Sequence, residues 1–428
     1  MKLALHGGTP VRTRKEARGE WPVYGNEEKE NLQSVLESGV WSYNGPYERR
    51  MLDEWRSYVG SRYALAAVNG TVTLQIALEA LDIGFGDEVI LPGLTWQATA
   101  AVVVDVNAVP VLVDVEPDTW CIDPSAVEAA ITDRTAAIIV VHLYGNMTDM
   151  DAILDIAERH GLPVIEDAAH QHGAEWRGRK TGNLGTIGSF SLQLSKVLTA
   201  GEGGLLTTNQ HDLWVKMDAL RNCGRRPEHD DDSDKGAGVY ASDGDLIQSG
   251  NYRITEFQAA VILPAISRLD RQNAERERTA AALDDVLRSV PGLEPMKRDE
   301  RQTRRAYFNW AFRYNADVFA GGGVPRELFH QALSAELSMD FEACYEPLND
   351  CSLYRPRTKK RYRISDEHWA RIDPSRFELP VCSSVYSSTS VTTHHSFLLG
   401  GPSTVEAFHT ALDKIQSAVD ELRGSISS

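Results

Sequence analysis

The sequence predicts an α/β protein of two domains, a large one with a mostly parallel sheet and a smaller C-terminal α/β domain. At 428 residues the chain is too long for one compact core. Between about residues 60 and 210, short β-branched runs alternate with helix-period apolar spacing, which is typical of parallel strands joined by right-handed crossovers. A long helical pattern from Thr255 to Leu287 then links the domains. We place the large domain, with the N-terminal segment, at residues 1–262, and the linking helix with the small domain at 263–428.

The elements of the large domain follow from apolar spacing. In a sheet of this kind ligands bind at the carboxyl ends of the strands, where Gly70, Thr71, Trp96 and Asp167 fall. Buried strands are predicted at Glu88–Leu91, Val109–Val113, Ala137–Val141 and Leu162–Ile165, and helices at Val72–Leu81, Trp96–Asn107, Pro124–Ile131 and Met150–His160.

The remainder of the chain is less regular. Residues 225–250 are polar and turn-rich, which predicts a loop. After the long helix, the pattern predicts a strand at Tyr307–Tyr314 and helices at Pro325–Leu337 and Thr404–Leu422.

Composition excludes several classes of function. A net charge of −17 argues against nucleic acid and anionic membranes as partners. The five cysteines form no CxxC pair, so neither a disulfide framework nor a metal site is expected. The first residues carry too short an apolar stretch for a signal peptide, and no window approaches a membrane span. We therefore expect a cytoplasmic protein.

Two residues indicate the chemistry. Lys196 lies between a short β-type run and the glycine-rich turn Gly201–Gly204. Val164–Asp167 reads as a buried strand that ends in a carboxylate. A lysine that can form a Schiff base and an aspartate that can keep a pyridine nitrogen protonated are the minimum equipment of a pyridoxal 5'-phosphate enzyme. We therefore expect Lys196 and Asp167 to be the catalytic residues.

Further cofactor contacts have candidates of lower specificity. Gly70 and Thr71 precede a helical run and could cradle a phosphate, although Gly-Thr equally serves as an ordinary cap. Ser191 could add a hydroxyl to the phosphate. Trp96 could stack on the cofactor ring or belong to the core. His170 could reach the phenolic oxygen of the ring or be structural.

Longer motifs place the chain in a family. With Lys196–Gly204 and Gly250–Ala260, it resembles the DegT/DnrJ/EryC1/StrS family of sugar aminotransferases, from Trp21 to about Ile415. The resemblance implies a pyridoxal-phosphate-dependent transaminase of fold type I, the aspartate aminotransferase architecture. It also implies a homodimer with shared active sites, because the family asparagine that matches Asn251 reaches the cofactor phosphate of the neighbouring subunit.

Within the family, the chain is most similar to the L-glutamine:scyllo-inosose and 2-deoxy-scyllo-inosose aminotransferases of aminocyclitol and aminoglycoside antibiotic biosynthesis. This implies amino transfer from L-glutamine or L-glutamate to a small polyhydroxy ketone. The segments that carry the similarity are Leu91–Ala100, Val115–Pro124, His142–Gly145, Met296–Arg298 and Thr393–His395.

Candidates for the substrate site are Tyr345, His394 and His395, which could grip substrate hydroxyls, although paired histidines are more often structural. His170–His172 resembles the 3-amino-5-hydroxybenzoate synthases instead. An aminotransferase for keto nucleotide sugars or carbasugars, or a 3-amino-5-hydroxybenzoate synthase-like enzyme, therefore stays an alternative. So does a non-catalytic pyridoxal-phosphate-binding sensor, although no DNA-binding module is visible. The acidic stretch Asp230–Asp234 lies in the loop that a partner subunit would present.

Overall fold

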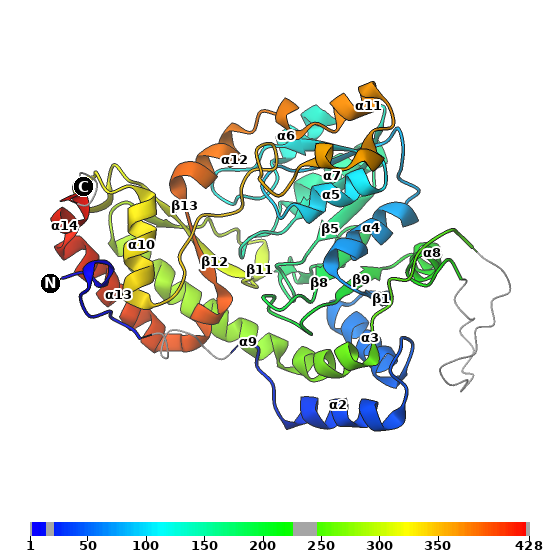
Figure 1. Cartoon of the computed structure of the whole chain (residues 1–428), viewed down its shortest axis with the longest axis horizontal. Helices are drawn as coiled ribbons and strands as arrows, with labels where there is room; N and C mark the ends of the chain where they lie inside the picture. The colour runs from blue at the N-terminus through cyan, green and yellow to red at the C-terminus, as the bar shows by residue number, and fades with distance from the viewer. Residues whose placement is uncertain (1, 14–20, 226–245, 425–428) are drawn as a thin grey trace.

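A seven-stranded sheet forms the centre of the large domain. The computed structural model describes residues 2–13, 21–225 and 246–424 (Figure 1). Strand β9 runs antiparallel to β1 and β8, and the other neighbouring pairs are parallel, so the predicted mostly parallel sheet is confirmed. In spatial order the strands are β1 (Tyr63–Ala67), β9 (Gly204–Thr208), β8 (Ile187–Ser191), β5 (Val164–Asp167), β4 (Thr135–Val141), β2 (Glu88–Pro92) and β3 (Val109–Val113).

Helices cover both faces of this sheet, because successive strand residues point to opposite sides. In β4, Ile139 and Val141 pack in one apolar core, whereas Ile138 and Val140 pack in another. All four strands and four helices predicted in this region are confirmed. The helices of the large domain are α2 (Asn26–Ser38), α3 (Pro46–Val59), α4 (Gly70–Ala80), α5 (Ala98–Asp105), α6 (Pro124–Ala130), α7 (Met150–His160) and α8 (His211–Arg221).

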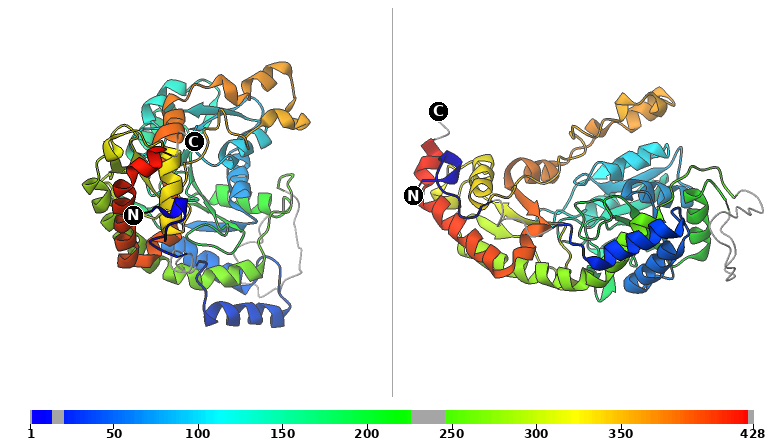
Figure 2. Two further views of the ribbon diagram at one scale, coloured as in Figure 1. Left: turned by 60° about the vertical axis from the view of Figure 1, so that its left-hand side comes forward. Right: turned by 60° about the horizontal axis from the view of Figure 1, so that its bottom comes forward.

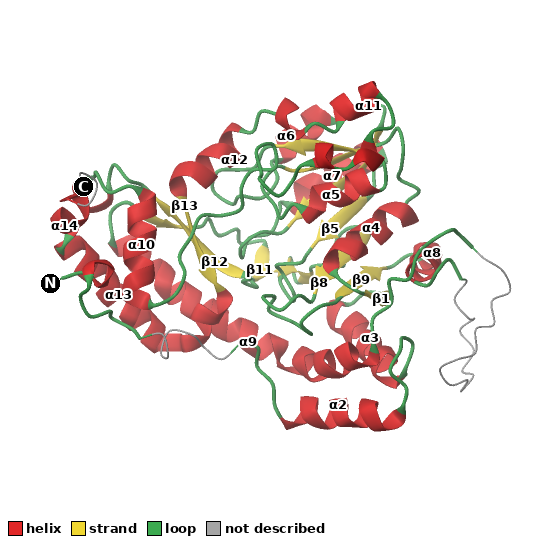
Figure 3. Ribbon diagram, viewed as in Figure 1, coloured by secondary structure: helices red, strands yellow, loops and turns green. Residues whose placement is uncertain are grey.

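The long helix α9 (Glu256–Ser289) runs from the large domain to the small one (Figure 1). There an antiparallel sheet in the order β10-β12-β13 packs against helices at the left of Figure 3. The prediction of one continuous helix at Thr404–Leu422 is wrong in one respect, because the observed helix is interrupted at Ala418. The elements here are β10 (Leu293–Pro295), β12 (Asn309–Tyr314), η2 (Phe319–Gly321), α10 (Arg326–Leu337), β13 (Ser390–His394), η7 (His395–Gly400), α13 (Gly401–Ser417) and α14 (Val419–Gly424).

Packing crosses the predicted domain division, which stays a prediction. Helix α9 continues unbroken through residues 262 and 263. Leu3 at the N-terminus packs in the core of the small domain, and both chain ends lie there (Figure 2). Residues between 344 and 385 reach back onto the core of the large domain. The remaining elements are η1 (Ala4–His6), β6 (Glu175–Trp176), β7 (Arg179–Lys180), β11 (Gln302–Arg304), η3 (Pro356–Thr358), η4 (Lys360–Tyr362), α11 (Asp366–Arg371), η5 (Pro374–Arg376), α12 (Pro380–Ser384) and η6 (Val385–Thr389).

Candidate active site

Lys196 lies in the loop that joins β8 to β9, beside the carboxyl end of β8. Its backbone N–H donates to the carbonyl oxygen of Gln193 at 2.9 Å. Its side-chain nitrogen lies 3.9 Å from the centroid of the Phe308 ring. Burial lowers the pKa of the amine to about 8, although the charge of Asp167 acts to raise it. A substantial fraction of this amine is therefore neutral, and nucleophilic, near neutral pH.

Asp167 ends β5 and is buried. The Thr99 hydroxyl donates to one carboxylate oxygen at 2.9 Å, and the N–H of Ala169 donates to the other at 3.3 Å. Burial raises the pKa of Asp167, while these two donors and the charge of Lys196 oppose the rise. A buried carboxylate is unfavourable without a positively charged partner. A protonated ring nitrogen in this position would be such a partner.

The residues of the predicted phosphate cradle lie at and beside the N-terminus of α4. The Asn69 side chain caps this helix by accepting from the N–H of Val72 at 2.9 Å, and the N–H groups of Gly70 and Thr71 have no partner within the helix. A Cβ atom on Gly70 would lie 2.7 Å from the Cβ of Ser191. Glycine thus keeps helix and strand close enough for these groups to face one anion, which fits the cofactor phosphate.

His170 is buried in an aromatic stack. Its ring lies parallel to that of Phe308, at a centroid distance of 4.0 Å and an interplanar angle of 21°. Nε2 is 3.3 Å from the hydroxyl of Tyr345, whereas Nδ1 is buried without a hydrogen-bond partner in the described part of the chain. Burial and the charge of Lys196 hold its pKa well below the usual range, so the ring is neutral. One polar atom therefore stays available for a ligand such as the cofactor.

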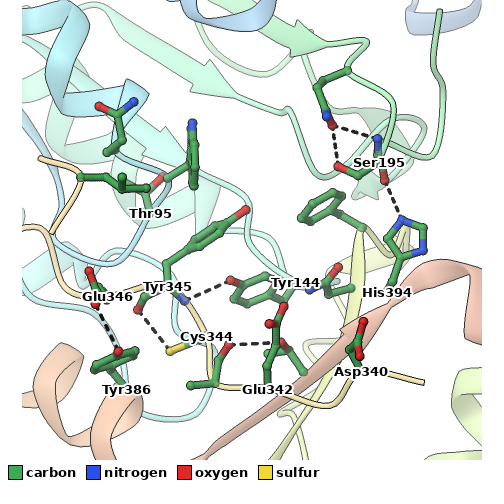
Figure 4. A pocket seen from close by; sticks show the side chains of 18 of the residues that line it. Thr95, Tyr144, Ser195, Asp340, Glu342, Cys344, Tyr345, Glu346, Tyr386 and His394 are labelled. Atoms are coloured by element: carbon green, nitrogen blue, oxygen red, sulfur yellow. Dashed lines mark hydrogen bonds between the residues drawn. The ribbon is translucent and has the colours of Figure 1, made fainter. Parts of the chain in front are cut away.

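A cleft of about 870 Å³ opens next to these residues, between the two domains (Figure 4). Trp96, which is 45% exposed, and Tyr345 line it, with ring centroids 5.7 Å apart. Ser195 and Phe308, the neighbours of Lys196, are part of its lining. Among the described residues, its walls hold the carboxyl groups of Asp340, Glu342 and Glu346 but no lysine or arginine.

The structure separates the remaining candidates. His394 lines the cleft, as Tyr345 does. His395 is fully buried behind it and does not line the cleft. Asn251 is exposed, pairs with Asn222 in an isolated bridge and lies outside the cleft lining. Most of the loop predicted at 225–250, with Asp230–Asp234, falls outside the described residues.

Sequence reasoning missed three contributors to this site. Thr99 hydrogen-bonds Asp167 across 68 positions of sequence, and Phe308 contacts both Lys196 and His170. The Tyr144 hydroxyl accepts from the backbone N–H of Tyr345 at 3.2 Å. Thr99 had a detectable signal, because it lies one helical turn after Trp96 at the same strand end. The other two are brought in by tertiary packing alone.

Comparison with known proteins identifies the family. The model of the DegT/DnrJ/EryC1/StrS aminotransferase family matches residues 22–387. The chain belongs to this family. It is 44% identical to an L-glutamine:2-deoxy-scyllo-inosose aminotransferase of Streptoalloteichus tenebrarius, over 98% of this chain and 99% of that protein. It is 42% identical to an L-glutamine:scyllo-inosose aminotransferase of Streptomyces griseus, with the same coverage.

Solved structures agree on the architecture. A 3-amino-5-hydroxybenzoic acid synthase superposes with a TM-score of 0.78 at 31% identity, over 94% of this chain and 99% of that one. The DesV structure of S. venezuelae, a complex with a ketimine intermediate, has a TM-score of 0.76 at 28% identity, over 91% and 94% of the two chains. This chain is thus a pyridoxal-phosphate-dependent aminotransferase of fold type I, and those three expectations are confirmed.

Two features are absent from residues 2–13, 21–225 and 246–424. No helix there combines the length and the apolar character that a membrane crossing needs. In the same ranges, histidine, cysteine and carboxylate side chains do not gather in groups of three that could hold a metal ion.

Proposed function

We propose that this enzyme moves the amino group of L-glutamine to a small cyclitol ketone, scyllo-inosose or its 2-deoxy form, in aminocyclitol antibiotic biosynthesis. L-glutamate is the alternative donor. The observation that carries the proposal is 42–44% identity, over 98% of the chain, to aminotransferases named for these two ketones.

The cleft supports an acceptor without phosphate. Its described walls present three carboxyl groups and no lysine or arginine, so a nucleotide sugar would bring its diphosphate beside like charges. A polyhydroxy ketone carries no charge, and its hydroxyl groups can bond the Tyr345 hydroxyl and donate to the carboxyl groups that line the cleft. Tyr345 is the proposed contact to substrate hydroxyls, since both ring nitrogens of His394, the other candidate that lines the cleft, already have partners.

Pyridoxal phosphate, when bound, supplies a reactive carbonyl and a ring that withdraws electrons from the substrate carbon. For that cofactor, Lys196 is the proposed covalent anchor. Once an amino substrate has displaced it, the freed amine would take the α-proton of the donor and later return a proton to the acceptor carbon. A pKa of about 8 suits both steps, since the amine can accept and release a proton near neutral pH.

Asp167 is the proposed partner of the ring nitrogen, oriented by the Thr99 hydroxyl. Its negative charge would hold a proton on that nitrogen. Gly70, Thr71 and Ser191 would bind the phosphate, and Trp96 would cover the ring from the cleft. Asp167 itself is buried, which limits water at the ring nitrogen and favours proton transfer along the intended path.

The proposed homodimer would complete each site with Asn251 of the second subunit. Asn251 is exposed and lies away from its own cleft. Near the N-terminus, large apolar side chains are also exposed, among them Leu36 at 58% and Trp41 at 50%. Such exposure is expected of a surface that a second copy covers.

Complementation tests this sharing. Lys196→Ala and Asn251→Ala chains, each impaired alone, are coexpressed with different tags and the mixed dimer is isolated. If each site takes its lysine and its asparagine from different subunits, one of the two sites in the mixed dimer is intact, and about half of wild-type activity returns. A mixed dimer as inactive as its parents would contradict the shared site.

A substrate panel tests the proposed reaction. The purified enzyme is given scyllo-inosose, 2-deoxy-scyllo-inosose and 4-keto nucleotide sugars, with glutamine or glutamate as donor. We expect turnover of the keto-cyclitols, with kcat/KM at least about 100-fold above that of the nucleotide sugars, a difference of about 2.7 kcal/mol. Turnover of the nucleotide sugars alone would overturn the proposal.

A further inference from the structure

The backbone just before Lys196 is held by side chains from distant parts of the chain. The indole N–H of Trp21 donates to the carbonyl oxygen of Leu194 at 2.9 Å. The carbonyl oxygen of Ser195, which belongs to the peptide bond with Lys196, lies 3.1 Å from Nε2 of both His394 and His395. Figure 4 draws the contact of His394 with this oxygen.

The protonation state of His395 follows from its other contact. Nε of Arg276 lies 3.2 Å from Nδ1 of His395. A guanidinium can only donate, so Nδ1 accepts and the ring proton of the neutral histidine resides on Nε2. Burial and the charge of Arg276 hold the pKa of His395 well below its usual range, which keeps the ring neutral. His395 therefore donates to the Ser195 carbonyl.

His394 is arranged in the same way. The backbone N–H of Ser396 points at its Nδ1 from 3.3 Å, and the Ser396 hydroxyl lies 2.9 Å from the same atom. Since a backbone N–H can only donate, Nδ1 of His394 accepts and the ring proton resides on Nε2. Two N–H groups then converge on one carbonyl oxygen, and each is fixed by a donor on the far side of its ring.

Arg276 is the unusual member of this group. It is fully buried on α9, yet no carboxylate pairs with it among the described residues. Nη1 donates to the side chain of Asn273 at 3.1 Å, and the guanidinium lies 5.3 Å from the centre of the Trp21 ring. Burial lowers the pKa of Arg276 to about 9. Keeping an unpaired cation in such a place is unfavourable, so its presence calls for a role.

We propose that Arg276, His395, His394 and Trp21 form a clamp that fixes the peptide between Ser195 and Lys196. These are positioning residues, since they act on the reaction through Lys196. With the backbone held, the amine can leave and return in every catalytic cycle by rotation of its own side chain. The clamp comes from the N-terminal segment, α9 and the small domain, so it ties the position of the lysine to how the two domains pack.

The inference rests on the proposed role of Lys196, and a matched pair of variants at His395 tests it. In His395→Gln, the side-chain amide can place an N–H near the position of Nε2 and restore the donor to Ser195. In His395→Asn, the amide reaches only the position of Nδ1, so the contact with Arg276 is kept and the donor to Ser195 is lost. The two variants thus differ at the clamped carbonyl.

We expect His395→Asn to lower kcat about 10- to 100-fold, because small misplacements of a reacting group cost rates of that order, while KM changes less than about threefold. His395→Gln should recover kcat to within about threefold of wild type. Visible circular dichroism of the bound cofactor should change in His395→Asn and resemble wild type in His395→Gln. Thermal unfolding of the cofactor-free proteins serves as the control for folding.

Wild-type kcat and dichroism in His395→Asn would overturn the proposal, and so would equal losses in both variants. If His395→Asn fails to fold, Trp21→Phe replaces it, since phenylalanine keeps a ring beside Arg276 but cannot donate to Leu194. Its kcat should fall about threefold or more, and an unchanged kcat would again overturn the clamp. Lys196→Ala separates the two hypotheses: cofactor that can still be trapped covalently in this variant would refute the role of Lys196 itself.

Discussion

The amine of Lys196 should react with carbonyl compounds near neutral pH. Its pKa of about 8 leaves about one tenth of the amine neutral at pH 7. An ordinary lysine, with a pKa of 10.5, has about one part in three thousand in that form. Because only the neutral amine attacks a carbonyl, Lys196 should hold roughly 300 times more reactive amine at pH 7 than an exposed lysine.

Cofactor capture measures this directly. Stopped-flow absorbance follows the second-order reaction of pyridoxal phosphate with the cofactor-free protein between pH 6 and pH 10. We expect the rate to rise about tenfold per pH unit up to a midpoint near 8 and to level off above it. Burial disfavours the charged form of the amine, so the midpoint lies below the ordinary lysine pKa of 10.5.

The charge of Asp167 acts in the opposite direction, since it raises the pKa of Lys196. Asp167→Asn should therefore move the capture midpoint below that of the wild type. Asp212→Asn, at a fully exposed position, is the control and should leave the midpoint unchanged. A wild-type midpoint near 10, or an upward move in Asp167→Asn, would refute this reasoning.

Three further predictions concern the surrounding groups. In Gly70→Ala the new Cβ would lie 2.7 Å from that of Ser191, so the dissociation constant for the cofactor should rise at least about tenfold. In the control Gly84→Ala the new Cβ would make only an ordinary contact at 3.6 Å, and the dissociation constant should stay unchanged. Thr99→Val removes a hydrogen bond to the buried carboxylate, so kcat should fall about tenfold at constant folding stability; an unchanged kcat would contradict this. Tyr345→Phe should raise KM for the ketone about threefold to tenfold while the first half-reaction with glutamine keeps its rate; a loss confined to the glutamine half-reaction would assign the hydroxyl elsewhere.

Local patterns were sufficient to predict most of the large domain. Apolar spacing defines β2 to β5 and α4 to α7, because the strands are short apolar runs and the helices carry apolar residues at helical spacing, such as Met150, Ile153 and Ile156 of α7. The strands β1, β8 and β9 have five residues each, as β2 and β3 do, but the antiparallel direction of β9 depends on the return of the chain past Lys196. No local pattern encodes that return.

The site divides in the same way. Lys196 and Asp167 stand out because Asp167 ends a strand, Lys196 follows one, and each carries a functional group suited to the cofactor. The two histidines near position 394 looked like substrate contacts, yet His395 lies fully buried against Arg276, which is 119 positions away. Contacts of that separation are made by tertiary packing, so the sequence could suggest the residues but not their geometry.

The most direct test is to find where the cofactor attaches. The enzyme is loaded with pyridoxal phosphate, reduced with borohydride, digested and examined by mass spectrometry. We expect a single modified peptide whose fragments place the pyridoxyl group on Lys196, and no such peptide from Lys196→Ala. Modification at another lysine, or an equal yield from the alanine variant, would contradict the account.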